Sequence, residues 1–293
     1  MSFQLSCEST VDMPYREIAA RDISVIPFTY QVDGEEFPDD MGRDPEALPR
    51  FYRFLSEGRF PTTSQINEFR YEEYFESLLQ KGDVLHISFT SGMSASVNNA
   101  ITAADKLRAR YPERKLIVID SLCASSGYGL LVDTAADLRD AGRSLEEVAE
   151  WVSENRTRIH HQFFTTDLQY FKRSGRVSGA AATLASILSI CPIMRVSRDG
   201  RILAYDKVRG KNNAIRETLR VMEAHAEGGT DYRGKCFICH SNCLEDAEKT
   251  RNAILSRFPS IREVRIFDVG TIVAAHSGPG TVAVFFFGDE REE

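Results

Sequence analysis

The chain has 293 residues and a formal net charge of −7, from 36 basic and 43 acidic residues. Apolar residues make up 42% and charged residues 27%, which is typical of a globular protein long enough for two domains. The acidic balance argues against a protein that binds duplex nucleic acid by neutralising phosphates. The opening MSFQLSCEST lacks the features of an export signal, and no apolar stretch reaches the length of a membrane span. We therefore expect a cytoplasmic protein with no integral membrane segment.

Short apolar runs alternate with amphipathic segments along the chain. The runs that predict buried strands are 23–28, 84–89, 116–119, 162–165, 235–239, 264–267 and 281–287. Helical spacing of apolar residues predicts helices over 71–80, 145–154 and 213–226, and Ser144 with Glu147 forms a candidate capping box. This alternation predicts an α/β fold of two packed domains, 1–160 and 161–293, with largely parallel sheets. We expect the acidic residues 288–293 to be solvated.

Two polar loops in the first half are candidate anion-binding sites. The loop Phe-Pro-Thr-Thr-Ser-Gln at 60–65 contains Thr63 and Ser64, whose hydroxyls can donate to an anion or cap the following helix. The segment 84–100 is typical of a strand, a Ser/Gly turn and a helix. Such a turn directs backbone N–H groups toward the carboxyl edge of a sheet. Ser94 and Ser96 then either add hydroxyl donors to that site or only cap the helix.

The same turn supports an alternative, a serine hydrolase. Gly-Met-Ser-Ala-Ser at 92–96 is one residue short of the nucleophile elbow G-x-S-x-G, because Ser96 stands where the second glycine is needed. Asp268 and His276 follow Ser94 in the order that such hydrolases use. This hypothesis predicts covalent chemistry at Ser94.

Three segments of the second half are also candidates. Arg176 follows a short helix that ends at Gly175, and it either binds a carboxylate or phosphate or complements the helix dipole. His276 lies in a Gly/Pro turn before an apolar strand, where it either contacts a ligand or serves the turn. The uncharged segment 180–190 predicts a helix that is buried in the core or lines an apolar slot.

The six cysteines are expected to be free thiols in a reducing compartment. Cys236, Cys239 and Cys243 form a cluster with His240, which raises the alternative of a metal or redox module. However, Cys236 and Cys239 fall on opposite sides of a predicted strand, and no second C-x-x-C pair exists. We therefore expect no metal site and no cofactor.

Taken together, these segments resemble the DegV family, the fatty-acid-binding proteins of bacterial fatty acid kinase. The matching segments run in order along nearly the whole chain. They are Cys-Glu-Ser-Thr-Val-Asp-Met-Pro at 7–14, Thr-Ser-Gln at 63–65, the turn at Ser94, Asp-Ser at 120–121 through Gly-Tyr-Gly at 127–129, Gly-Arg-Val at 175–177, Pro-Ile at 192–193 with Gly200, and His-Ser-Gly-Pro-Gly at 276–280.

The resemblance implies a long apolar tunnel that holds one acyl chain. By the same resemblance, Thr63, Ser94 and His276 bind the carboxyl group and Arg176 lies near it, with Ser64 and Ser96 as secondary candidates. The family member is not itself an enzyme. It presents its long-chain fatty acid to a separate ATP-dependent fatty acid kinase, which makes an acyl phosphate, and transient contact with a membrane surface is compatible with that role.

Arg209 matches a basic position that the family associates with docking of the kinase. The chain also departs from the family pattern at three positions. Glu8 replaces the opening aspartate, Ala95 replaces a glycine of the Ser94 turn, and Cys191 replaces a lysine before Pro-Ile.

Overall fold

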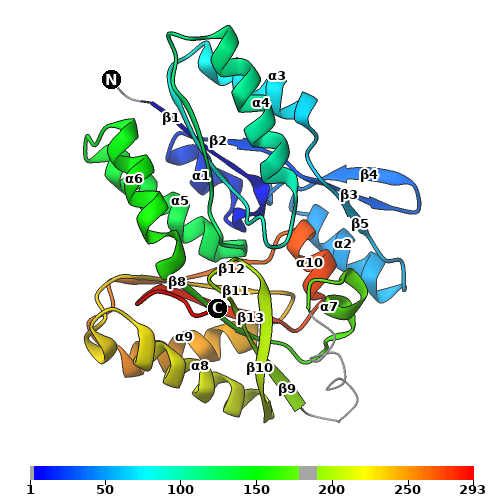
Figure 1. Cartoon of the computed structure of the whole chain (residues 1–293). Helices are drawn as coiled ribbons and strands as arrows, with labels where there is room; N and C mark the ends of the chain where they lie inside the picture. Colours follow the sequence, from blue (N-terminus) through cyan, green and yellow to red (C-terminus); the bar gives the residue numbers. More distant parts are fainter. Residues whose placement is uncertain (1–2, 178–189) are drawn as a thin grey trace.

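The computed structural model describes residues 3–177 and 190–293, and in this part of the chain helices pack around three sheets (Figure 1). The segment 180–190, expected to be a helix, lies outside the described residues except for Ile190, the first residue of a strand. Among the described helices, none combines the length and hydropathy that a bilayer-spanning segment requires.

The first sheet is parallel and belongs to the first half of the chain. Its strands, in spatial order, are β2 (Ile23–Ile26), β1 (Gln4–Glu8), β6 (Val84–Ser88) and β7 (Leu116–Asp120). The helices of this half are α1 (Tyr15–Ala20), α2 (Ala47–Ser56), α3 (Glu68–Leu79), α4 (Ser96–Arg110), α5 (Ser125–Asp140) and α6 (Leu145–Asn155). The α3–α4 pair and the α5–α6 pair lie on opposite sides of this sheet (Figure 1). Because the strand order reverses between β1 and β6, their carboxyl ends open a crevice of the kind that binds ligands in α/β proteins.

The second sheet is mixed, with only one parallel pair among its described strands. In spatial order it contains β10 (Ile202–Arg209), β9 (Ile190–Val196), β8 (Ile159–Phe164), β13 (Val282–Phe287), β11 (Lys235–His240) and β12 (Glu263–Asp268). Among the strands of this sheet that the structure describes, only β11 and β12 pair in parallel. The described helices of this half are α7 (Gln169–Ser174), α8 (Lys211–His225), α9 (Leu244–Arg257) and α10 (Thr271–Ser277).

The α/β class is thus confirmed, and the parallel arrangement holds for the first sheet but not for the second. The difference has a physical cause. A tight turn joins β9 to β10, and neighbours joined by so short a connection must run antiparallel. A strand that is buried on both faces has the same run of apolar residues whether it pairs in parallel or antiparallel. The sequence periodicity therefore does not distinguish parallel from antiparallel pairing.

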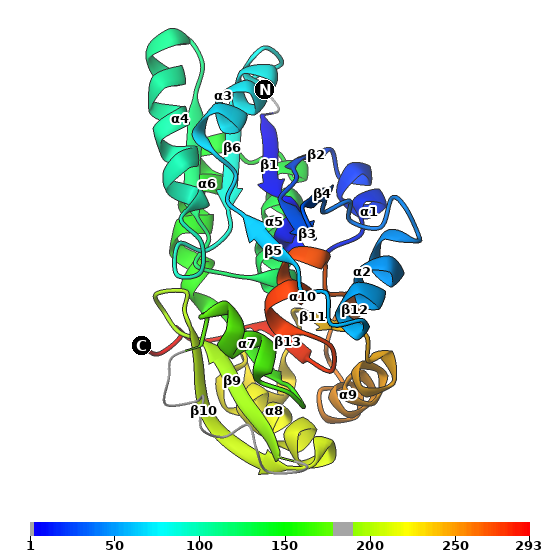
Figure 2. The same ribbon diagram turned by 90° about the vertical axis from the view of Figure 1, so that its right-hand side faces the viewer.

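A third, smaller sheet extends the first half toward the second. It contains β4 (Glu35–Pro38), β3 (Thr29–Val32) and β5 (Thr62–Ser64), all antiparallel. Figure 2 shows α10, from the second half, next to this sheet. A helix from residues 271–277 therefore contacts strands from residues 29–64.

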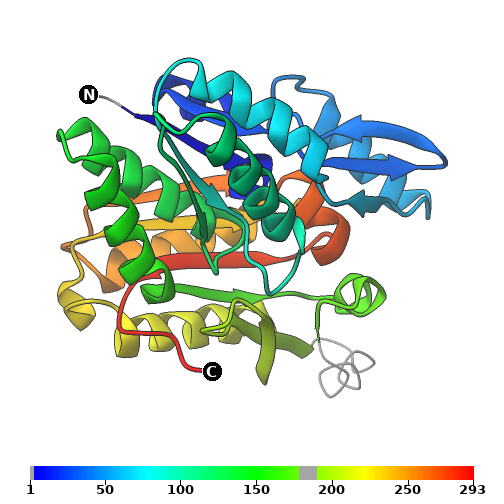
Figure 3. The ribbon, with the colours of Figure 1, turned by 45° about the horizontal axis from the view of Figure 1, so that its top comes forward.

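The second sheet separates two cores. Alternate residues of its strands face opposite sides, as the strand period requires. Phe163, Phe237 and Phe285 pack into the core shared with the first half, whereas Phe164 and Phe286 pack against the α8–α9 side. Figure 3 shows α8 and α9 on the face of this sheet opposite the first half. The two halves therefore share one core without a flexible linker. Because the two halves share a core, the domain boundary near residue 160 remains a proposal.

Two glycines permit a close approach of the backbone between the halves. A Cβ on Gly92 would lie 2.4 Å from the carbonyl oxygen of Gly200, and Gly200 has a φ of +79° that favours glycine. The Thr90 hydroxyl donates to the same Gly200 oxygen at 3.1 Å. The loop after β6, which holds Ser94, is thereby fixed against the β9–β10 turn.

A fully buried carboxylate, Glu8, ties the first half together at the carboxyl end of β1. It accepts hydrogen bonds from the Ser88 and Tyr71 hydroxyls at 2.6 and 2.8 Å, from the Phe89 N–H at 2.9 Å and from Tyr128 at 2.5 Å. Burial alone would raise the pKa of Glu8. The His86 ring and the hydrogen bonds that stabilise the ionised form outweigh that effect and lower the pKa to about 2.

We predict that Glu8→Gln destabilises the protein and flattens its acid dependence. The folded pKa of about 2 lies below the ordinary glutamate pKa of 4.5, so the stabilisation is fully present above about pH 4.5 and is lost as the pH falls toward 2. The shift corresponds to a contribution on the order of 3 kcal/mol near neutral pH. Urea unfolding at several pH values measures it.

The exposed Glu73, replaced as Glu73→Gln, is the matched control and should keep both the stability and its acid dependence. An unchanged free energy of unfolding in Glu8→Gln across this pH range would contradict the role given to the Glu8 carboxylate.

Candidate functional site

A cavity lies between the two halves, at the carboxyl ends of β1 and β6. Its empty volume is about 960 Å³ including its mouth, which falls within the range of small-molecule sites. Most of its wall is apolar and comes from both halves, with Phe28, Phe89, Phe163, Phe171, Ile272 and Phe285 among the lining residues. An elongated apolar ligand is the kind of molecule that such a wall stabilises.

The cavity also has a polar part, formed by the predicted site residues. Thr63, Ser64, Ser94, Arg176 and His276 all line it, although they are spread over more than 200 positions of the sequence. The structure therefore brings five of the predicted residues together. It does not bring Ser96 or Arg209 to this cavity.

Thr63 and His276 form a hydrogen bond across the junction of the halves, with 2.9 Å between Thr63 Oγ1 and His276 Nε2. Thr63 lies in β5 opposite Tyr30 of β3, and His276 lies in the last turn of α10 rather than in a loop. His276 Nδ1 is buried and has no hydrogen-bond partner among residues 3–177 and 190–293.

In either tautomer of His276, this pair retains one hydrogen that no described residue is shown to accept. If the Thr63 hydroxyl donates to Nε2, the imidazole proton is on Nδ1 and unused. If Nε2–H donates to the hydroxyl oxygen, the hydroxyl hydrogen is unused. A buried donor without a partner is costly, so an acceptor such as a carboxylate oxygen would be stabilised at this position.

Two buried carboxylates of the first half hold the start of α10. The Gly270 N–H donates to Asp12 Oδ1 at 3.0 Å, and the Thr271 hydroxyl donates to Asp39 Oδ1 at 2.9 Å. Burial raises the pKa of Asp12, and it raises the pKa of Asp39 to about 6. At its other end α10 stops at Gly278, where a Cβ would lie 2.0 Å from the ring of Tyr170.

Sequence reasoning did not assign these two aspartates a role. Asp12 lies inside the segment 7–14 that matches the family, and Asp39 directly follows β4. These positions are the features of the sequence that could have marked both aspartates as candidates. Their contact with α10 joins positions more than 200 residues apart, and no periodicity in the sequence reports such a pairing.

The electrostatics of the polar part favour a neutral imidazole. Burial, followed by the nearby charge of Arg176, lowers the pKa of His276 to about 4. His276 is therefore neutral at pH 7, and Arg176 is the positive charge beside it. An anion at this point meets one guanidinium and uncharged hydrogen-bond donors.

Ser94 and Ser96 have different surroundings. Ser94 lies in the turn after β6, where its N–H donates to the Thr90 carbonyl at 3.3 Å and its Oγ accepts from the Ser96 N–H at 3.2 Å. Ser96 is fully buried, and its Oγ accepts from the Ile66 N–H at 2.9 Å. Ser94 thus faces the cavity, while Ser96 connects α4 to the segment after β5.

Arg209 lies at the far end of β10 from the cavity. Ile202, at the start of that strand, lines the cavity, and Arg209 follows seven residues later at about 3.3 Å per residue, or roughly 20 Å away. Arg209 is exposed. Its position fits contact with another molecule rather than with a ligand in the cavity.

The hydrolase arrangement is absent from the described residues. Asp268 lies 3.5 Å from His240 Nε2 instead of contacting His276. His276 Nδ1 has no carboxylate to orient it, and its Nε2 bonds to Thr63. A nucleophile, a base and an orienting acid in hydrogen-bond contact are what the mechanism requires, so this alternative is not favoured.

The cysteine cluster does not converge on a metal within residues 3–177 and 190–293. Cys236 packs in the core on the α8–α9 side of the sheet and Cys239 in the core on the opposite side, as the strand period predicted. Burial raises the pKa of both thiols, so they are protonated at neutral pH.

The chain matches known proteins over its whole length. Residues 2–289 match the family described as "Uncharacterised protein, DegV family". A DegV domain-containing protein of Clostridium perfringens is 33% identical over 99% of both chains. A DegV family protein of Thermus thermophilus, described as fatty acid binding, superposes with a TM-score of 0.87 at 25% identity, over 98% of this chain and 100% of that one. The fatty acid kinase B3 protein of Streptococcus pneumoniae, loaded with linoleic acid, superposes with a TM-score of 0.84 at 21% identity, over 99% and 100%.

We predict that Arg176→Gln raises the pKa of His276 while leaving it below 6.5. The substitution removes the nearby positive charge, but burial, which is the larger cause, remains. Titration of the ligand-free protein followed by NMR of the histidine rings measures the change, and the wild-type midpoint should be about 4.

The exposed Arg173, whose guanidinium stacks on Phe60, provides the control Arg173→Gln and should leave the midpoint unchanged. A wild-type midpoint near 6.5, or equal midpoints in wild type and Arg176→Gln, would refute the described electrostatics.

Proposed function

The chain belongs to the DegV family, and we propose that it binds one long-chain fatty acid in the cavity between its halves. The observation that carries the proposal is the composition of the cavity: an apolar wall from both halves and a polar part that contains Thr63, Ser94, His276 and Arg176. In this proposal the acyl chain lies along the apolar wall and the carboxyl group lies at the polar part.

The energetics support this orientation. Each methylene removed from water contributes roughly 0.8 kcal/mol, so the acyl chain provides most of the affinity. A carboxylate that enters a buried site must be hydrogen-bonded, or it takes up a proton. The unused hydrogen of the Thr63–His276 pair, the Ser94 hydroxyl and the charge of Arg176 meet that need.

We further propose that the protein is not the catalyst but presents the bound acid to a separate ATP-dependent fatty acid kinase. The kinase would transfer the γ-phosphoryl group of ATP to a carboxylate oxygen, giving an acyl phosphate and ADP. The pneumococcal kinase B3 protein, which shares this fold, supports the proposal. Arg209, exposed and far from the cavity, is the proposed docking residue for the kinase.

We predict that Thr63→Val weakens fatty acid binding by about 10- to 100-fold, because a hydrogen bond to a charged group contributes roughly 1.5–3 kcal/mol. The measurement is a titration of delipidated protein with oleate, followed by native mass spectrometry. Thr62→Val, at the exposed neighbour in β5, is the matched control and should bind like wild type. Equal affinities for wild type and Thr63→Val, or an absence of oleate uptake by wild type, would overturn the carboxyl site.

We predict that Arg209→Glu slows acyl phosphate formation and leaves fatty acid loading unchanged, because the residue lies outside the cavity. Reconstitution with the kinase of the same organism and ATP measures the rate. Arg114→Glu, at an exposed arginine of the first half, is the control and should keep the rate of wild type. A rate unaffected by Arg209→Glu would exclude Arg209 from the docking surface without affecting the binding proposal.

A further inference from the structure

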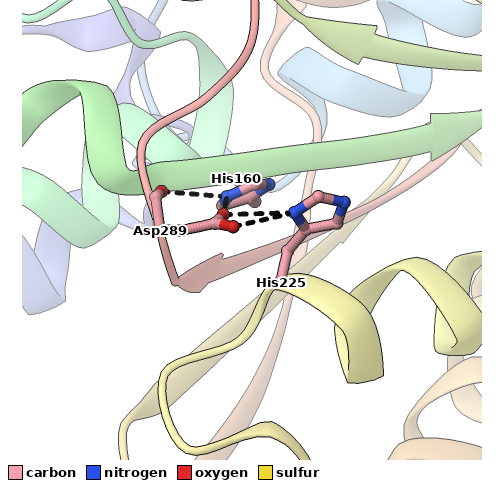
Figure 4. Close-up of side chains that lie close together, drawn as sticks. All are labelled: His160, His225 and Asp289. Atoms are coloured by element: carbon pink, nitrogen blue, oxygen red, sulfur yellow. Dashed lines mark hydrogen bonds and ion pairs between the residues drawn. The ribbon is translucent and has the colours of Figure 1, made fainter.

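Three side chains that commonly bind metals meet outside the cavity. Figure 4 shows His160 of β8, His225 at the end of α8, and Asp289, which follows β13, gathered around one point. His160 Nε2 and His225 Nδ1 lie 2.9 and 3.1 Å from Asp289 Oδ1, and the three donor atoms lie within 4.8 Å of one another. In the part of the chain that the structure describes, no other group of His, Cys, Asp or Glu side chains meets this spacing.

The backbone holds these residues together independently of their side chains. The Asp289 N–H donates to the His225 carbonyl at 3.1 Å, and β13 pairs with β8 so that Phe286 stands opposite His160. Gly288 permits this approach, because a Cβ there would lie 2.2 Å from the His225 carbonyl oxygen. The backbone of residues 288–293 is therefore fixed to the sheet, and Arg291 is only 4% exposed, while the four acidic residues of this tail are exposed as expected.

Two of the three separations between the donor atoms are close to those of a zinc site, and the third lies within 4.8 Å. Zinc bonds of about 2.0–2.1 Å in a tetrahedral arrangement separate the ligand atoms by about 3.3 Å. The two histidine nitrogens are within a few tenths of an ångström of this distance from Asp289 Oδ1. The Asp289 side chain is 59% exposed and that of His225 is 31% exposed, so both can rotate enough to admit an ion.

The donor set selects the class of ion. Two imidazoles and one carboxylate suit zinc and neighbouring transition metals, whereas magnesium and calcium prefer oxygen ligands alone. His160 and His225 line a polar cavity, which gives an ion a route from solvent. Three arginines also line this cavity, and each is already engaged. Arg195 lies 2.6 Å from Glu292, Arg220 donates to Glu217 at 2.6 Å, and the buried Arg291 donates to the Ile159 carbonyl at 2.7 Å.

We propose that His160, His225 and Asp289 bind one zinc ion, which fastens the segment after β13 to β8 and α8. Three protein ligands leave a fourth position for water. His160 Nε2 binds the ion in the tautomer that carries its proton on Nδ1. The site is separate from the fatty acid cavity, and its role is to stabilise this end of the second sheet.

The test uses full-length, tag-free protein treated with a chelator and then titrated with zinc chloride by calorimetry, with cobalt chloride as a spectroscopic probe. We expect one ion per chain, a visible cobalt spectrum displaced by zinc, and a higher melting temperature with zinc. His225→Ala and Asp289→Asn should each weaken zinc binding by more than the roughly 10- to 100-fold that loss of an outer-shell partner costs.

Asp268→Asn is the matched control, since Asp268 also lies beside a histidine, His240, but without a third ligand; it should bind zinc like wild type. Unchanged oleate binding shows that each variant is folded. If His225→Ala does not bind oleate, the zinc affinity of Asp289→Asn is the result that tests the proposal. Absence of stoichiometric zinc binding at millimolar concentration, or equal binding by wild type and Asp289→Asn, would overturn the proposal and leave these residues as a hydrogen-bonded cluster.

Discussion

The attachment of α10 to the first half of the chain is the constraint on which the site depends. Asp12 and Asp39 accept hydrogen bonds from the first residues of this helix, and Gly278 ends it against Tyr170. With both ends fixed, the last turn carries His276 to Thr63 of the small sheet. Without this attachment the polar part of the cavity would not form, because its residues come from both halves.

The cavity separates two physical tasks. In the proposed complex, the apolar wall stabilises a long hydrocarbon chain, and this contribution is not directional. The polar part would recognise the anionic end of that chain through hydrogen bonds, which are directional. His276 is kept neutral by burial and by Arg176, so the polar part offers donors without a buried, charged imidazole that would itself need a partner.

The sequence predicted the α/β class, the main buried strands and the capping box of Ser144 and Glu147, since these depend on local periodicity. It did not predict the antiparallel pairs of the second sheet, because a run buried on both faces looks the same in either direction. Thr63, Ser94 and His276 were singled out from their motifs, and the structure places them at one cavity. The sequence pattern does not predict contacts between residues far apart in the chain. Such contacts include the hydrogen bonds that Asp12 and Asp39 accept from α10, and the approach of Asp289 to two histidines.

A crystal structure of the protein with oleate tests the proposed orientation of the bound acid. We expect one acid per chain, with a carboxyl oxygen within hydrogen-bond distance of Thr63 Oγ1 or His276 and the acyl chain along Phe163 and Phe285. A carboxyl group at the opposite end of the cavity, or an acyl chain bound elsewhere on the protein, would contradict it.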